Sequence, residues 1–167
     1  GRKIATMSVP VLFEAPVANG LVSHFVSAVS GGNLYRKSSF LLDSLGQQVF
    51  SPVVTLVERP HVPRAIASSY FDDDGVATRD RDVVKAGVLQ GYFLGTYSAR
   101  KLGMASTGNA GGNHNLILEP GELDFPGLIR HMGRGLLDTE LMGQGINLVT
   151  GDYSRGAAGF WVEGGEI

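Results

Sequence analysis

The sequence predicts an α+β fold with a mostly antiparallel, glycine-rich sheet, open or barrel-like, and a few short helices. Two observations support this class. Short apolar runs are separated by turn residues rather than by long helical crossovers. Glycine accounts for 24 of the 167 residues, roughly twice its usual share. Such a content is typical of many turns, bulges and close backbone approaches.

The first third of the chain predicts two strands and two helices. An apolar run bounded by prolines favours a strand over 9–13. Apolar residues then recur at intervals of three and four over 16–29, which predicts a helix that ends at the glycine pair 31–32. A second, short helix is expected over 38–46, capped by a serine and closed by a glycine. Residues 53–58 read as a strand that stops before a proline.

The middle of the chain predicts a turn, a hairpin and a helix. Three aspartates and a glycine at 72–75 indicate an acidic turn rather than a calcium loop, because the spaced oxygens of an EF-hand are missing. Charges alternate in sign over 79–82, so we expect that segment to be solvated. The apolar pieces around Gly87 predict a hairpin or a bulged strand over 83–93. A helix over 94–102 should end at a glycine.

The last third begins with the most polar, glycine-rich segment, 105–115, which should be a loop. Asp124 is placed to cap a helix that has a proline in its first turn. Strands are expected over 116–118, 136–141 and 156–162. Together these elements predict a single domain spanning residues 1–167.

Composition excludes several classes of protein. The net charge is −2 with scattered basic residues, so we expect no nucleic-acid partner. The absence of cysteine excludes disulfides, zinc ribbons and cysteine nucleophiles. No apolar stretch is long enough for a membrane span, and no signal peptide is visible, so we expect a cytoplasmic protein without a membrane partner. Both ends fall within predicted structure, which indicates a piece of a longer chain.

Few residues suggest chemistry. None of the four histidines has a metal-ligand spacing from another ligand, and His114 is the one that closes the glycine-rich loop. In the same loop, Thr107, Gly108 and Asn109 offer backbone amides and a carboxamide, which suit a peptide backbone as well as a plain turn. The residues alone therefore leave two interpretations open, a peptide-binding loop and a structural turn. They define no self-contained active site.

Several stretches resemble the TldD/PmbA family. They read EAPVANGL at 14–21, STGN at 106–109, GQGIN at 143–147 and GDYSRGAAGFW at 151–161. The last is long and is similar to the PmbA branch, also called TldE. The resemblance covers essentially the whole chain. It implies most of the C-terminal domain of a longer protein, without that protein's N-terminal domain.

The family is one of metalloproteases linked to peptide maturation, antitoxin degradation and modulation of DNA gyrase. Its TldD branch carries a HExxxH zinc motif, and the resemblance aligns that motif with Glu14 to Asn19. Glu14 and Asn19 then replace the two histidines, and Ala15 replaces the glutamate that takes a proton from the zinc-bound water. Ala15 cannot accept a proton and Asn19 is a poor zinc ligand.

The resemblance therefore implies a subunit that is itself non-catalytic, without metal or other cofactor, in a TldD–TldE metalloprotease complex. Zinc is expected on the TldD-type partner, and this chain is expected to help enclose an unfolded or extended peptide. Homodimers are a further expectation. Two alternatives stay open: a metallopeptidase active on its own through another metal site, using for example Glu14 and His24, and a regulatory binding protein without proteolytic activity.

Overall fold

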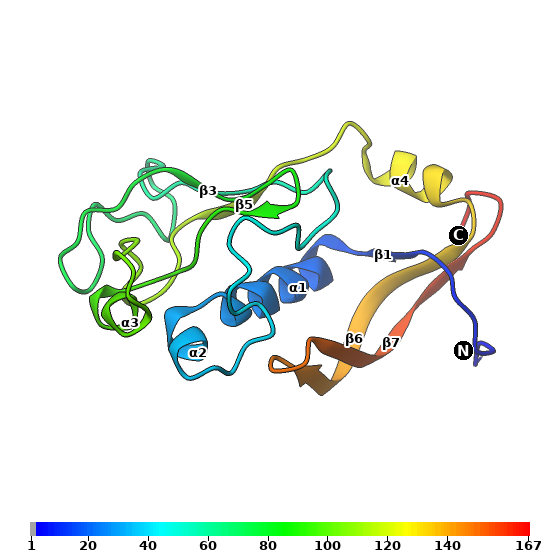
Figure 1. Cartoon of the computed structure of the whole chain (residues 1–167). Coiled ribbons are helices and arrows are strands. Elements are labelled where there is room, and N and C mark those ends of the chain that lie inside the picture. Colours follow the sequence, from blue (N-terminus) through cyan, green and yellow to red (C-terminus); the bar gives the residue numbers. More distant parts are fainter. Residues whose placement is uncertain (1–2) are drawn as a thin grey trace. The chain divides into compact units, whose positions relative to one another are not determined.

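The computed structural model describes residues 3–167, which pack as two compact units. Unit 1 contains the N-terminal part up to Val22, Gly121–Ile146 and Tyr153–Ile167. Unit 2 contains Ser23–Pro120 and Asn147–Asp152. Helix α1 (Ala15–Ala28) contributes its first half to unit 1 and its second half to unit 2. Each unit is described by itself below (Figure 1).

Unit 1 is built on a three-stranded sheet with the order β1-β6-β7. Strand β1 (Val11–Phe13) pairs in parallel with the start of β6 (Gly135–Asn147), so that Phe13 lies opposite Asp138. Strands β6 and β7 (Asp152–Val162) form a long hairpin, visible in Figure 1 as the gold to red ribbons labelled β6 and β7.

Helix α4 (Phe125–Met132) packs on this sheet through a small apolar core. Its N-terminus is capped as the sequence predicts, because the Asp124 carboxylate accepts a hydrogen bond from the amide of Gly127 at 2.8 Å. The core residues are Ile129, Leu137 and Val162, with Leu12 and Met132 against them. Burial of apolar area contributes about 25 cal/mol per Å². Because this core contains few side chains, it stabilises unit 1 only modestly.

Unit 2 contains a four-stranded antiparallel sheet with the order β4-β3-β2-β5. Its strands are short: β2 (Leu56–Glu58), β3 (Arg81–Lys85), β4 (Val88–Leu89) and β5 (Leu116–Leu118). Central strand β2 is buried at all three positions, including the charged residue Glu58. The apolar core of unit 2 includes the following fully or almost fully buried residues: Phe25, Val29, Leu34, Leu56, Val83, Val84, Leu89 and Leu94.

Two short helices, α2 (Gly31–Tyr35) and α3 (Thr96–Leu102), pack against each other in unit 2. Glycine is needed at position 31 because a Cβ atom there would overlap the side chain of Ser98. Helix α3 ends as predicted at Gly103, whose φ of 67° is left-handed and whose amide bonds back to the last turn.

Most predicted elements are confirmed, including the helix at 16–29, the acidic turn, the hairpin around Gly87, the capped helix α4 and the final two strands. The α+β class is also confirmed. The barrel-like alternative is wrong, because the structure contains two separate open sheets. The prediction of a single domain over 1–167 stays a prediction.

Two predictions of secondary structure were wrong. Residues 38–46 form turns instead of a helix, with Asp43 in a left-handed conformation and the Ser39 hydroxyl bonded to the backbone of Ala28. The serine therefore anchors α1 rather than capping a new helix. The glycine pair 31–32 does not close the first helix but begins α2, after α1 has ended at Ala28.

Candidate functional site

The residues predicted to carry function fall into two groups. Glu14, Ala15 and Asn19 lie at the start of α1 in unit 1. The loop residues Thr107, Gly108, Asn109 and His114 lie in unit 2. Each group is described in its own unit.

The start of α1 presents the positions aligned with the zinc motif at the surface, where Glu14, Ala15 and Asn19 are all exposed. The Glu14 carbonyl accepts the amides of Val17 and Ala18 at 2.9 Å, so Glu14 is the residue from which the helix begins. The side chains are a carboxylate, a methyl group and a carboxamide. Within residues 3–167, no three His, Asp or Glu side chains gather closely enough to hold a metal ion. These residues therefore do not fit a catalytic zinc, which needs three protein ligands.

A buried carboxyl group lies next to this helix start. Asp138 on β6 is 1% exposed, and its backbone carbonyl accepts the amide of Glu14 at 3.0 Å. One carboxyl oxygen accepts a long hydrogen bond from the amide of Glu140, and the other receives none from the described residues. Burial raises the pKa of Asp138, while the Glu140 amide acts in the opposite direction.

The glycine-rich loop of unit 2 is anchored by one buried carboxylate, that of Glu58 on β2. One Glu58 oxygen accepts the backbone amide of His114 at 2.7 Å and the Asn109 carboxamide at 2.8 Å. The His114 ring nitrogen Nδ1 lies 3.2 Å from the same oxygen. Glu58 is 2% exposed, Asn109 5% and His114 9%. The two loop side chains therefore hold the loop in place from inside and do not face solvent.

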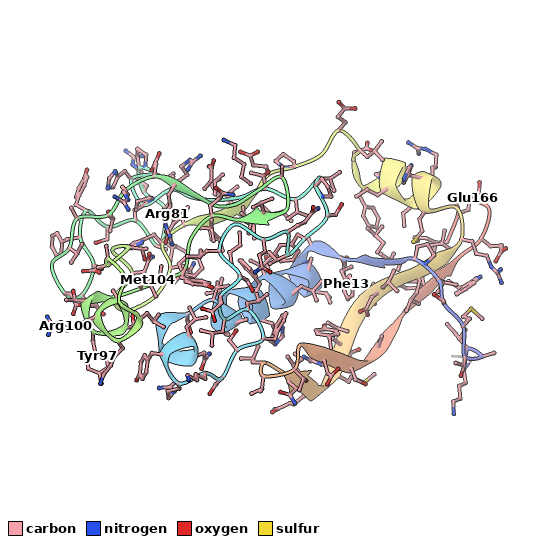
Figure 2. All side chains as sticks on the ribbon, viewed as in Figure 1. Phe13, Arg81, Tyr97, Arg100, Met104 and Glu166 are labelled. Atoms are coloured by element: carbon pink, nitrogen blue, oxygen red, sulfur yellow. The ribbon has the colours of Figure 1, made fainter. Side chains whose placement is uncertain are left out.

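Arg81 on β3 completes this buried cluster. Its Nε donates to the second Glu58 oxygen at 2.7 Å, and its two terminal nitrogens donate to the Tyr92 carbonyl at 2.9 Å and to Asn109 at 3.0 Å. Figure 2 shows the Arg81 side chain among the strands and loops of unit 2. The expectation that 79–82 is a solvated segment is therefore wrong at Arg81, because Glu58 supplies a buried counter-charge.

Thr107 and Gly108 lie in the same anchored loop. The Thr107 hydroxyl donates to Asn109 at 2.7 Å and accepts the Leu94 amide at 2.8 Å. Gly108 is buried and left-handed, with a φ of 74°. Its amide donates to the Ser106 hydroxyl at 3.2 Å. The structure thus brings all four predicted loop residues together around one network.

The predicted acidic turn holds the same loop from its other side. One Asp72 oxygen accepts the amide of Ala110 at 2.9 Å, and the other accepts the amides of Asp74 and Val76. Asp74 accepts the amide of Thr96 at 2.8 Å, at the start of α3. The carboxylates of Asp72 and Asp74 therefore accept backbone donors and hold the turn and the loop together.

The anchored loop forms one wall of a groove in unit 2 with a volume of about 370 Å³. Residues of α2 and α3 also line the groove. The lining contains two tyrosines, Tyr35 and Tyr97, and an unusual number of glycines: Gly31, Gly32, Gly95, Gly111 and Gly112. Gly111, Gly112 and Asn113 are exposed along it. Such a lining lets another polypeptide backbone approach closely.

Sequence reasoning missed Glu58 and Arg81, which organise the loop. Glu58 stands at the end of an apolar run and is followed by an arginine and a proline. A charged residue at such a position normally indicates that the strand ends there. Arg81 stands in an alternating charge run. A single charged residue inside a predicted buried strand is the signal that could have found Glu58, because such a charge needs a partner.

Comparison with known proteins gives a consistent result. The family model for the C-terminal domain of PmbA/TldA metallopeptidases matches residues 6–167. In Haemophilus influenzae, the metalloprotease PmbA homolog is 56% identical over 167 residues, covering 99% of this chain and 37% of that protein. The TldD homolog of the same organism is 27% identical over 155 residues, covering 86% of this chain and 32% of that protein.

A solved structure agrees with this match. It is a protein of Thermotoga maritima, described as a candidate modulator of a DNA gyrase, with a TM-score of 0.89 and 37% identity. The match covers 99% of this chain and 40% of that one. The chain thus spans well under half the length of these relatives. It belongs to the PmbA/TldA metallopeptidase family, in the PmbA branch, and corresponds to the family's C-terminal domain.

Proposed function

We propose that this chain is the peptide-holding part of a PmbA-type subunit that works with a zinc-bearing TldD-type subunit in proteolysis. The observation that carries the proposal is the glycine-lined groove of unit 2, whose wall is fixed by the buried Glu58 network. The similarity to a metalloprotease PmbA homolog supports the link to proteolysis. The existence of a separate TldD relative supports the idea of a partner subunit.

The start of α1 supports a scheme in which this chain holds the peptide and the partner subunit hydrolyses it. Hydrolysis at zinc needs ligands and a nearby base, and Ala15 offers no acid–base group. Glu14 and Asn19 are exposed, and the described part of the chain contains no cluster of three potential ligands. We therefore assign the metal and the general base to the partner.

The groove suits an extended peptide because five of its fifteen lining residues are glycines. Exposed glycines at 111 and 112 leave main-chain groups accessible, and the amide of Gly111 makes no hydrogen bond to the described residues. An extended peptide can use such groups through main-chain hydrogen bonds, independently of its sequence. In this proposal Thr107, Gly108, Asn109 and His114 form the peptide-binding wall by holding the loop, and residues 110–113 contact the peptide.

Filling the groove should abolish peptide binding without unfolding the protein. Gly32 lies in α2 and lines the groove, and a Cβ there would meet only the flexible end of Arg36, at 3.4 Å. We expect Gly32→Leu in the full-length protein to weaken binding of an unstructured, fluorescently labelled peptide by at least about tenfold. Fluorescence anisotropy measures the affinity, and thermal unfolding checks the fold.

Gly121→Leu is the matched control. Gly121 is exposed and does not line the groove, and a Cβ atom at this position would meet no other atom within 4 Å. This variant should bind the peptide as the unmodified protein does. Equal affinity of the Gly32→Leu variant, with its fold intact, would show that the groove does not hold the peptide.

A further inference from the structure

We propose that the groove selects acidic segments of its peptide, through a row of cations and tyrosines along α2 and α3. This inference rests on the proposed function and deepens it, because it names the chemistry of the peptide that the groove prefers. The groups concerned are Arg36, Tyr35, Tyr97 and Lys101, which we call the cation–tyrosine row.

The row is continuous in space. The Arg36 guanidinium lies over the Tyr35 ring, 5.4 Å from its centre. The rings of Tyr35 and Tyr97 meet edge to face at 5.7 Å, and the Lys101 ammonium lies 5.5 Å from the centre of the Tyr97 ring. Both tyrosines line the groove. Two cations are thus fixed at its rim by stacking on aromatic rings, which limits the rotamer freedom lost on binding.

The positive charge of this rim is not neutralised. Arg36, Lys37, Arg100 and Lys101 are all exposed, and none makes an ion pair among residues 3–167. Figure 2 shows Tyr97 and Arg100 extending outward from α3. Among the described residues, Asp74 is the one charged residue of the groove lining, and its carboxylate keeps its negative charge while it accepts the neutral amide of Thr96. The exposed carboxylate of Asp73 lies beside Gly111. The four cations at the ends of α2 and α3 outnumber these two carboxylates, so the balance of charge beside the groove is positive.

Lys37 is a further exposed cation next to the row. It follows α2 with a φ of 58°, a left-handed conformation that glycine adopts without strain. Asp43, Arg64 and Ala86 share this conformation, so it marks Lys37 as a position where glycine can be introduced and is not by itself a sign of binding. Cations at the ends of short helices also stabilise the helix dipole. That effect accounts for charge at the end of α3, but not for tyrosines stacked between cations of two helices.

The chemistry favours an acidic peptide over other anions. The groove is lined by several glycines, which suits an extended main chain with carboxylate side chains every second residue. A nucleic acid would require a long basic stripe, whereas this chain has a net charge of −2. Tyrosine hydroxyls and exposed amides supply further donors to carboxylate oxygens.

The test compares three labelled, unstructured peptides of one length that differ only at four positions, which carry glutamate, glutamine or lysine. Affinities for the full-length protein are measured by fluorescence anisotropy at low and at high salt. We expect the glutamate peptide to bind about tenfold more tightly than the glutamine peptide at low salt, and the lysine peptide to bind least. High salt should reduce the difference between the peptides.

Three variants locate the effect. Arg36→Gln/Lys101→Gln should remove most of the preference for glutamate, whereas Arg79→Gln/Lys85→Gln, which removes the same charge from exposed positions that do not line the groove, should keep it. Lys37→Gly relieves the backbone strain, so it should be at least as stable as the unmodified protein while binding the glutamate peptide more weakly. Loss of affinity in that variant could not be assigned to unfolding.

Each outcome has one meaning. Equal affinity for the three peptides, or a preference that survives in Arg36→Gln/Lys101→Gln, would overturn the acidic selectivity while the peptide-holding function stands. An oligonucleotide of equal charge that outcompetes the glutamate peptide would also overturn it, in favour of a nucleic-acid surface. Failure of all three peptides to bind would instead refute the proposed function itself.

Discussion

Replacing Glu58 by alanine should lower the free energy of unfolding by about 3–5 kcal/mol. Glu58 is 2% exposed and accepts hydrogen bonds from Arg81, Asn109 and the amide of His114. Its removal leaves the Arg81 charge buried without its counter-ion and leaves two loop donors without an acceptor. Urea unfolding of the full-length protein measures the loss. Hydrogen exchange should show the largest loss of protection in the loop that contains Asn109 and His114.

Glu163→Ala is the matched control for this prediction. Glu163 also pairs with an arginine, Arg134, at 3.4 Å, but both side chains are more than half exposed. Such a surface pair contributes less than about 1 kcal/mol. In addition, Arg81→Met in the Glu58→Ala protein should recover part of the stability, because it removes the uncompensated charge. Equal effects of Glu58→Ala and Glu163→Ala would contradict the central role of Glu58.

Replacing Asp138 by asparagine should stabilise the protein at neutral pH and not in acid. Burial raises the pKa of Asp138 in the folded state above its ordinary value of 3.8. The folded state therefore favours the protonated carboxyl group, whose contribution to stability is complete in acid and is lost as pH rises through the raised pKa. At pH 7 the unmodified protein keeps a buried carboxylate with one oxygen that receives no hydrogen bond from the described residues. A neutral amide avoids this cost, so Asp138→Asn should raise the free energy of unfolding at pH 7 by about 1 kcal/mol.

The measurement is the difference in unfolding free energy between Asp138→Asn and the unmodified protein at pH 7 and near pH 4. The difference should be larger at pH 7. Asp124→Ala is the control with the opposite expectation, because the Asp124 carboxylate caps α4 and alanine offers no acceptor for the Gly127 amide, so the protein should be destabilised. A difference for Asp138→Asn that does not change with pH would show that this carboxyl group does not titrate between the two states as described.

Local signals in the sequence were sufficient for most of the fold. Asp124 before a proline predicted the capped helix α4, and Gly103 predicted the end of α3, because capping depends on neighbouring residues. The segment 38–46 misled for the opposite reason. Serine is a residue type that often caps helices, but the Ser39 hydroxyl donates to the carbonyl of Ala28, eleven residues away. Tertiary contacts of this kind leave no local pattern.

The candidate site was predictable only in part. The glycine-rich loop and its residues Asn109 and His114 stood out by composition, yet the sequence could not show that both side chains are buried. Both side chains are buried because they bond to Glu58 on strand β2, which is more than fifty residues away along the chain. The row of Arg36, Tyr35, Tyr97 and Lys101 likewise joins two helices that are distant in sequence. Pairings across such distances require the fold.

Peptide hydrolysis by reconstituted subunits tests the central claim most directly. The full-length protein is assayed on an unstructured peptide alone, with a TldD-type subunit, and with that subunit carrying glutamine in place of its HExxxH glutamate. We expect activity only with the intact partner, and a loss of at least about a hundredfold when the glutamate is replaced. Hydrolysis by this protein alone, abolished by a chelator, would contradict the assignment of the metal to the partner.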